Sequence, residues 1–259
     1  MKERKIKFVV PFPLSGEGLR NREEQLPKEL IKPGFKVKFV PVRNSVYWLD
    51  SYYEGLLLDF FLFEEGIKAE EEGYDALCID TVSDSGIQAL RSRLKIPVVG
   101  PGVASMHFAC MLGDKFSILT MWKKWNFVYI RELDEYKLWD RFASIRDVGE
   151  SPDQVRLLKG KKPNIFNRLE QEGLKAVEED GANVIILGST TMHQAHKYLS
   201  ERLPVPVLNP GLVAYKIAEM MVELRISQSK ARYPSPQEPK DELVHAMVDG
   251  SLRIPWKPK

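Results

Sequence analysis

Residues 73–81 read Gly-Tyr-Asp-Ala-Leu-Cys-Ile-Asp-Thr, and residues 181–189 read Gly-Ala-Asn-Val-Ile-Ile-Leu-Gly-Ser. The two stretches match without a gap, because Gly73 pairs with Gly181 and Thr81 with Ser189 at one offset of 108 residues. Each starts at a glycine, contains an apolar run and ends at a hydroxyl residue. Short apolar runs between turn residues are typical of strands buried on both faces of a parallel sheet. The match indicates two copies of one structural unit.

A second match lies further along each copy. Residues 95–104 read Lys-Ile-Pro-Val-Val-Gly-Pro-Gly-Val-Ala, and residues 204–213 read Pro-Val-Pro-Val-Leu-Asn-Pro-Gly-Leu-Val. Here Pro97 pairs with Pro206 at an offset of 109, so one residue has been inserted between the two matches. Each copy therefore has the order buried strand, hydroxyl-rich turn, helix, short strand, Pro-Gly turn and helix. The duplicated units extend over residues 73–112 and 181–224.

The rest of the chain alternates short apolar runs with longer amphipathic stretches, which is typical of βα units on a parallel sheet. We expect strands at residues 6–10, 36–40, 76–80, 98–100, 116–120, 184–188 and 205–208. We expect helices at residues 53–72, 84–94, 103–112, 164–180, 192–203 and 212–224. The predicted fold is α/β, with two pseudo-symmetric parallel-sheet lobes and an active site in the cleft between them. Lobe 1 is assigned residues 1–115 with 213–259, and lobe 2 residues 116–212.

The composition excludes several classes of protein. Lysine and arginine number 38 against 36 acidic residues, and this balance gives no general attraction to nucleic acid or anionic membranes. One short basic and aromatic stretch, Trp122-Lys-Lys-Trp125, is better explained as a solvated helix. The apolar run Leu56–Phe63 is too short to cross a bilayer, which takes ~20 apolar residues. The run is consistent with a homo-oligomer but does not fix the oligomeric state.

Cysteine use and the N-terminus predict a cytoplasmic protein. The two cysteines, Cys78 and Cys110, have neither disulfide-framework nor zinc-finger spacing, so we expect buried thiols in a reducing compartment. Residues 1–7 are charged and lead directly into a short apolar run, without the long apolar region of a signal peptide.

The two turns after the matched strands are the first candidates for a site. In open α/β sheets, ligands bind at the carboxyl ends of strands, where loops meet the starts of helices. An isolated hydroxyl there is more often a helix N-cap. Two symmetry-related turns with surplus hydroxyls favour a shared site, with Thr81 and Ser189 as its central residues.

These segments together resemble the aspartate/glutamate/hydantoin racemase superfamily, and most closely its hydantoin racemase-like members. The resemblance covers nearly the whole chain and is carried by residues 73–86, 96–112, 181–192, 205–216 and 229–234. It implies a two-lobed enzyme that acts on a small-molecule substrate without a cofactor. It also implies that two cysteines flank the substrate's stereocentre, one removing and one returning a proton.

The positions that match those cysteines hold Thr81 and Ser189. A cysteine thiol has a pKa of about 8.5 that falls readily in a positive pocket, whereas an aliphatic hydroxyl titrates far higher. Without a neighbouring base, the two hydroxyls are poor proton-transfer groups, and the two-thiol mechanism is doubtful. Cys78 does not replace them, because it lies three residues before Thr81 in the strand and points to the opposite face.

The first strand also departs from the family. Where family members commonly hold the substrate carboxylate with an Asn-Pro-Asn-Thr-like turn, this chain reads Pro11-Phe12-Pro13-Leu14-Ser15. Pro11 and Phe12 would give the substrate an apolar wall, and Ser15 with the backbone of residues 16–18 would bind an anion. The family also has a tyrosine-bearing loop that closes over the substrate, and Tyr53 is its candidate here.

Further groups on the two turns complete the expected site. Asp80 ends an apolar strand and needs a partner, so we expect Asp80 and His193 to activate a water or a hydroxyl across the cleft. For Asp84, a helix-capping role and a ligand-binding role are equally expected. His193 and His196, three residues apart on a helix, are weak candidates for a metal site, and no metal is expected. The substrate-binding candidates on these turns are Val82, Ser83, Thr190 and Thr191.

The sequence leaves the reaction open. We expect an enzyme acting on a small carboxylate or cyclic amide, such as a hydantoin-like ring, through an enolate or oxyanion. The resemblance favours racemisation, whereas the missing thiols favour hydrolysis, decarboxylation or another lyase reaction. The alternative from another class is a non-catalytic protein that binds a small ligand.

Overall fold

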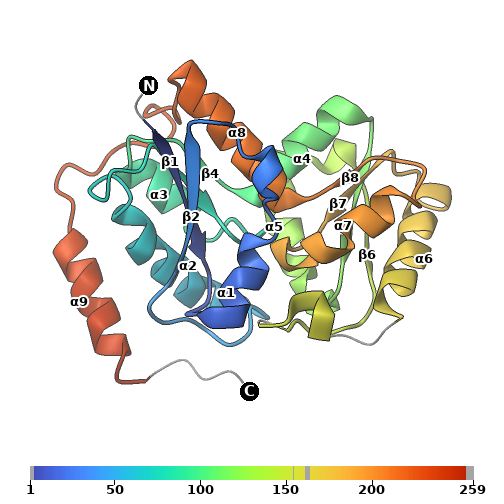
Figure 1. Ribbon diagram of the computed structural model, residues 1–259, viewed down its shortest axis with the longest axis horizontal. Helices are drawn as coiled ribbons and strands as arrows, with labels where there is room; N and C mark the ends of the chain where they lie inside the picture. The colour runs from blue at the N-terminus through green and yellow to red at the C-terminus, as the bar shows by residue number, and fades with distance from the viewer. Residues whose placement is uncertain (1–2, 154, 161–163, 255–259) are drawn as a thin grey trace.

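Two four-stranded parallel sheets form the centre of the computed structural model, which describes residues 3–153, 155–160 and 164–254 (Figure 1). The strand orders are β2-β1-β3-β4 and β6-β5-β7-β8, and the pairing between neighbours is parallel throughout. The first sheet contains β1 (Arg4–Val10), β2 (Phe35–Pro41), β3 (Ala76–Ile79) and β4 (Val98–Val99). The second contains β5 (Phe116–Thr120), β6 (Phe142–Asp147), β7 (Val184–Leu187) and β8 (Val207–Leu208). The predicted α/β class with two parallel sheets is confirmed.

The helices follow the strands in the same order in both halves. They are α1 (Gly16–Glu23), α2 (Tyr52–Ile67), α3 (Ile87–Arg93), α4 (Pro101–Leu112), α5 (Asn126–Tyr136), α6 (Ile165–Glu178), α7 (His193–Ser200), α8 (Pro210–Leu224) and α9 (Asp241–Ser251). Short 3₁₀ helices occupy Lys28–Leu30, Lys123–Trp125, Trp139–Arg141, Leu157–Gly160 and Thr190–Met192. Each half has four βα units, and the strand order is the same in both halves. This is the duplication seen in the sequence, expressed in the structure.

Some elements were absent from the sequence prediction, and each has a weak pattern. Strand β6 is an edge strand whose residues are all only partly buried, so it lacks the apolar run of the other strands. Helix α1 has a single apolar residue over Gly16–Glu23, too few for an apolar stripe. Helix α3 begins at Ile87 instead of residue 84, because Asp84 and Gly86 have positive φ angles of 47° and 73° and form a turn before it.

The helix after the fourth strand of each half packs on the other half's sheet. Helix α8 contributes Ala214 and Tyr215 to a core that includes Phe8 of the first sheet. Helix α4 contributes Met106 to a core that includes Ile118 of the second sheet. The two helices also contact each other, so they join the halves and hold the strand ends close together (Figure 1). The lobe boundaries at residues 115/116 and 212/213 stay a prediction, which did not anticipate the packing of α4 on the second sheet.

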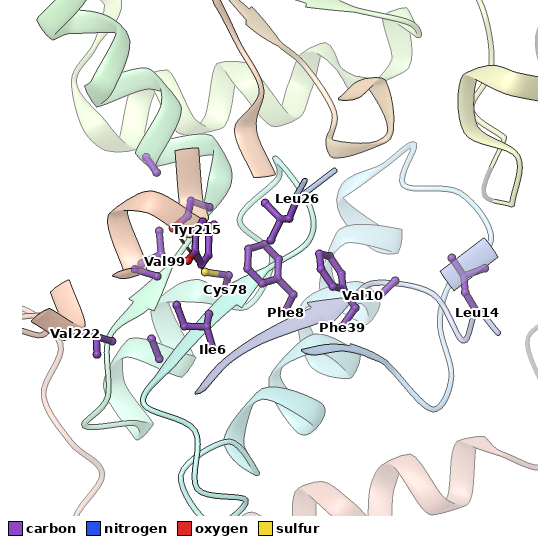
Figure 2. Close-up of a cluster of buried hydrophobic side chains, with 14 of the residues drawn as sticks. Ile6, Phe8, Val10, Leu14, Leu26, Phe39, Cys78, Val99, Tyr215 and Val222 are labelled. Atoms are coloured by element: carbon purple, nitrogen blue, oxygen red, sulfur yellow. Dashed lines mark hydrogen bonds between the residues drawn. The ribbon is translucent and has the colours of Figure 1, made fainter. Parts of the chain in front are cut away.

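Cys78 belongs to the core of the first sheet (Figure 2). Its side chain is fully buried beside Tyr215, and its Sγ lies 3.7 Å from the carbonyl oxygen of Ala214. Burial raises the pKa of this thiol well above its usual value. The expectation that Cys78 is a buried core thiol is confirmed, whereas Cys110 is only partly buried and donates to the carbonyl oxygen of Met106.

The apolar run at residues 56–63 lies within α2. One face of α2 is buried through Leu58 and Leu62, and the other leaves Leu56 70% exposed. Among the described residues, no helix combines the length and the apolar content that a membrane crossing requires. A homo-oligomer formed through the exposed face stays a prediction.

Candidate active site

A cleft opens where the carboxyl ends of β1, β3 and β7 meet, and it encloses about 520 Å³ of free space, open solvent included. Both halves of the chain contribute to it. Its lining residues are Pro11, Phe12, Arg22, Leu49, Leu58, Asp80, Thr81, Val82, Ser83, Trp125, Val128, Tyr129, Gly188, Ser189, Thr190 and Thr191. The structure therefore brings Thr81 and Ser189 to one cleft, as expected from the repeat.

The first turn holds a chain of hydroxyl groups. The Thr81 Oγ1 lies 2.8 Å from the Ser83 Oγ, which in turn lies 2.8 Å from the Ser85 Oγ. Ser83 and Ser85 are buried, and Thr81 is partly exposed to the cleft. The turn is thus an ordered row of hydroxyls that leads away from the cleft.

Asp84 in the same turn caps a helix. Its two carboxylate oxygens accept from the backbone N–H groups of Gly102 at 2.8 Å and Val103 at 2.7 Å, in the first turn of α4. Burial raises its pKa to about 6 despite these hydrogen bonds. The capping role expected for Asp84 is observed, on a helix other than the one that follows it.

The second turn repeats the first two positions of this pattern. The Ser189 Oγ lies 2.9 Å from the Thr191 Oγ1 and accepts from the Thr191 backbone N–H at 3.2 Å. Thr81 with Ser83 and Ser189 with Thr191 are equivalent pairs under the offset of 108. The row ends at Thr191, because the position equivalent to Ser85 holds His193.

Asp80 forms a buried ion pair with Arg22 of α1. The Arg22 Nη1 lies 3.4 Å from the Asp80 Oδ2, and the Gln25 Nε2 donates to the Asp80 Oδ1 at 2.9 Å. Asp80 is fully buried and Arg22 is 1% exposed. Burial is the largest influence on both groups: it raises the pKa of Asp80 and lowers that of Arg22, while their mutual attraction opposes each shift.

The same ion pair ties the two halves together beneath the cleft. Arg22 also donates to the Thr190 Oγ1 at 3.2 Å, and the Thr190 hydroxyl donates to the backbone carbonyl of Asp80 at 3.2 Å. The partner that Asp80 needed is therefore an arginine and not a histidine.

The structure places His193 and His196 away from the cleft lining. The His193 Nε2 donates to the backbone carbonyl of Asn21 at 2.8 Å, and the His196 Nε2 donates to that of Val207 at 3.0 Å. Burial lowers the pKa of His193 to about 4. Neither Asp80 nor His193 has the other among its partners, and within the described ranges no three His, Cys, Asp or Glu residues are grouped to hold a metal ion.

The remaining candidates divide between the cleft and the surface. Pro11, Phe12 and Val82 line the cleft, and the Phe12 ring lies 5.8 Å from the guanidinium carbon of Arg22. Ser15 precedes α1 as an exposed residue, and Tyr53 is 72% exposed on α2. The structure does not bring these last two to the lining, so an anion site at Ser15 and a lid at Tyr53 stay predictions.

Tyr129 of α5 is a cleft residue that sequence reasoning missed. Its hydroxyl donates to the Gly188 carbonyl oxygen at 2.6 Å and lies 2.9 Å from the Thr120 Oγ1. A Cβ added at Gly188 would lie 2.6 Å from the Tyr129 hydroxyl oxygen, so only glycine fits this strand end. Arg22, Leu49, Leu58, Trp125 and Val128 were missed as well. The signal for Arg22 was a carboxylate at the end of an apolar strand, which required a buried cation.

Comparison with known proteins points to one family. The family model for Asp/Glu/hydantoin racemase matches residues 19–218. A hydantoin racemase of Pseudomonas sp. (strain NS671) is 34% identical over 200 residues, which cover 77% of this chain and 78% of that protein. The structure of an allantoin racemase from Klebsiella pneumoniae superimposes with a TM-score of 0.83 at 23% identity, covering 92% of this chain and 95% of the other.

A solved arylmalonate decarboxylase shares the fold more distantly. It superimposes with a TM-score of 0.56 at 16% identity and covers 84% of this chain and 92% of its own. Proteins named as racemases and as a decarboxylase thus have this architecture. The reaction must be argued from the cleft, because one fold can carry several chemistries.

Proposed function

The chain belongs to the Asp/Glu/hydantoin racemase family, and from this premise we propose that it inverts a stereocentre next to a carbonyl group in a small cyclic amide of the hydantoin type. The observation that carries the proposal is the equivalence of Thr81 and Ser189. Both end matched strands, both line one cleft, and each is hydrogen-bonded to a second hydroxyl two residues later. Two such groups, with a base supporting the one that accepts, could remove a proton on one face of a substrate and return a proton on the other.

The charges of the cleft favour a neutral substrate. Arg22 and Asp80 are the charged residues among the described lining residues, and they are paired with each other. An amino acid or a dicarboxylate would need unpaired charges to replace its hydration. A cyclic amide has only dipoles to satisfy, and the hydroxyl-rich turns offer both donors and acceptors.

The composition of the lining favours a small ring with polar edges. The apolar surface comes from Phe12, Leu49, Leu58 and Trp125. The hydroxyl groups come from the two turns. An apolar wall with a few polar groups is the usual design of a small-molecule site, because the wall excludes water and the polar groups set the orientation. The named relatives, a hydantoin racemase and an allantoin racemase, support a ring of this kind.

In the proposed mechanism the protein removes and returns one proton. The Thr81 side takes the hydrogen from the carbon beside the carbonyl, and the electron pair of the broken bond is delocalised as an enolate. The Ser189 hydroxyl gives its proton to the opposite face of the same carbon, and its oxygen takes a proton from a solvent water. The base on the Thr81 side releases the removed proton to the resulting hydroxide, so both sides are restored. No covalent bond to the enzyme is required, and the substrate leaves with inverted configuration.

The test is incubation of the purified full chain with enantiopure 5-substituted hydantoins, allantoin and amino acids in D₂O. NMR would follow deuterium at the stereocentre, polarimetry the loss of optical rotation, and parallel assays ring opening and CO₂ release. We expect deuteration with loss of rotation for a cyclic amide. Ring opening or CO₂ release without exchange would replace racemisation by hydrolysis or decarboxylation, and binding without any turnover would indicate a ligand-binding protein.

A further inference from the structure

A second cleft borders the first turn. It is lined by Leu56, Asp59, Phe60, Phe63, Ser83, Asp84, Gly86, Ile87, Gln88, Ala89, Arg131, Glu132, Glu135 and Tyr136. Among the described residues, Ser83 is the one that lines both clefts. The row of hydroxyls on the first turn therefore passes between two solvent-facing spaces.

The far end of this row is the carboxyl group of Asp59 on α2. The Asp59 Oδ1 accepts from the backbone N–H of Gly86, the residue after Ser85, at 3.0 Å, and the Ser85 hydroxyl is close enough to lower the pKa of this carboxyl group. The turn and α2 are in close contact here, since a Cβ added at Gly86 would lie 2.8 Å from the Asp59 carbonyl oxygen. Thr81, Ser83 and Ser85 thus form a hydrogen-bonded row that starts at the candidate active site, and the carboxyl group of Asp59, which lines the second cleft, lies at the far end of this row.

The carboxylate sets the direction of the path. An ionised Asp59 can only accept, so the Ser85 hydroxyl donates to it. Ser83 then donates to Ser85, and Thr81 donates to Ser83, because each hydroxyl has one proton to give. The lone pairs of the Thr81 oxygen are left for the substrate. A hydroxyl held in this way is prepared to accept a proton.

We propose that Asp59 is the proton acceptor for Thr81, acting through Ser83 and Ser85. The proposal rests on the function proposed above and supplies the base that the hydroxyl replacing a catalytic cysteine would need. As the Thr81 oxygen bonds the substrate hydrogen, the Thr81 proton passes to Ser83, the Ser83 proton to Ser85 and the Ser85 proton to Asp59. The C–H electron pair stays on the substrate carbon. All three hydroxyls end neutral, and Asp59 ends protonated and exchanges with water through the second cleft.

The surroundings of Asp59 give the path a pH dependence. Burial raises its pKa, while Ser85, Arg131 and the Gly86 N–H lower it to a smaller extent. The titratable and charged groups that share its cleft are Asp84, Arg131, Glu132, Glu135 and Tyr136. Because the base must be ionised, exchange should fall as the pH falls through the raised pKa of Asp59.

The decisive experiment compares Ser85→Ala in two backgrounds by the rate of deuterium exchange. In the otherwise wild-type chain, loss of the relay should slow exchange by about 100-fold, the scale of general base catalysis. In a Thr81→Cys background the same change should cost at least about tenfold less, because a thiol ionises near pH 8.5 without help. An equal loss in both backgrounds, or no loss in either, would overturn the relay.

A second variant and a matched control complete the test. Asp59→Asn should remove the acid limb of the pH–rate profile, whereas Glu135→Gln, an acid in the same cleft with no contact to the hydroxyl row, should retain it. Circular dichroism and urea unfolding would show that each variant folds. A wild-type chain that exchanges no substrate would contradict the proposed function, whereas exchange that is insensitive to Ser85 and Asp59 would contradict only the relay.

Discussion

The turns at residues 80–86 and 188–193 occupy equivalent places in the two halves, and they agree only in part. Each has a hydroxyl at the strand end that pairs with a second hydroxyl two residues on, at 2.8 Å for Thr81 with Ser83 and 2.9 Å for Ser189 with Thr191. Beyond this pair they diverge. The first continues to a carboxyl group, and the second stops, because His193 turns away to a backbone carbonyl.

The residues just before these hydroxyls diverge as well. In the first half the strand ends in Asp80, held by Arg22 from the helix after β1. In the second half it ends in Gly188, whose carbonyl is held by Tyr129 from the helix after β5. The hydroxyl pair is thus the same in both halves, whereas the residues that hold the strand end before it differ. We infer that the first turn acts as the base and the second as the acid when the hydrogen faces Thr81, with the roles exchanged for the opposite enantiomer.

The largest effect should come from the base side. Thr81→Ala should lower deuterium exchange of the enantiomer whose hydrogen faces Thr81 by about 1,000-fold, since it removes the side chain that, among the described residues, starts the hydroxyl row toward Asp59. NMR in D₂O measures this rate directly. Exchange at the wild-type rate would show that the first turn is not the base, and it would contradict the proposed difference between the two turns.

The buried ion pair should matter most for stability. Asp80→Ala leaves Arg22 buried without its counter-ion and should lower the free energy of unfolding by about 3–5 kcal/mol. Urea unfolding followed by circular dichroism measures the change. A loss under ~1 kcal/mol would mean that the ion pair at the strand end of the first half stabilises the fold no more than the Tyr129 hydrogen bond at the strand end of the second half.

His193 should make the free energy of unfolding depend on pH in the acid range. Its native pKa of about 4 lies below the ordinary 6.5, so between these values the unfolded chain binds a proton that the native chain does not. Its contribution to stability is full above pH 6.5 and decreases as the pH falls toward 4. We expect His193→Gln to flatten the stability curve in this range by about 1–3 kcal/mol, measured by urea unfolding at several pH values. Parallel curves for the two chains would contradict the assignment.

The smallest change should come from Tyr129→Phe. The substitution removes the hydroxyl that bonds Gly188 and Thr120, at a cost of about 1–2 kcal/mol because neither group carries a charge. Thermal unfolding would detect it as a modest fall in Tm. A loss as large as that of Asp80→Ala would show that the two strand ends are supported equally strongly.

The sequence predicted the parts of the site that lie next to the repeat. Thr81 and Ser189 could be found because the offset of 108 aligns two buried strands whose periodicity is unambiguous. Ser83, Thr190 and Thr191 follow directly along the chain, and all three line the cleft. Local sequence was therefore sufficient to predict the site residues that directly follow a strand.

The supports of the site depend on contacts between distant segments. Arg22 and Tyr129 lie on α1 and α5, two helices that the prediction lacked. Helix α1 has a single apolar residue, whereas α5 has apolar residues at positions 129, 133 and 136 that could have indicated a helix. Asp59 sits in a long apolar helix, where one carboxylate does not indicate the turn whose Gly86 it contacts 27 residues later. His193 was expected to face Asp80, but the direction of its ring depends on where α7 begins and on Asn21 of the other half.

The most direct test of the account is the stereochemical course of exchange in Ser189→Ala. Each enantiomer of a substrate that the wild-type chain racemises would be incubated separately in D₂O, with deuterium content and configuration measured together. We predict that Thr81 and its relay still exchange the hydrogen of one enantiomer with retention, while inversion is lost. Inversion at the wild-type rate, or exchange into both enantiomers alike, would contradict the division of the site into a base turn and an acid turn.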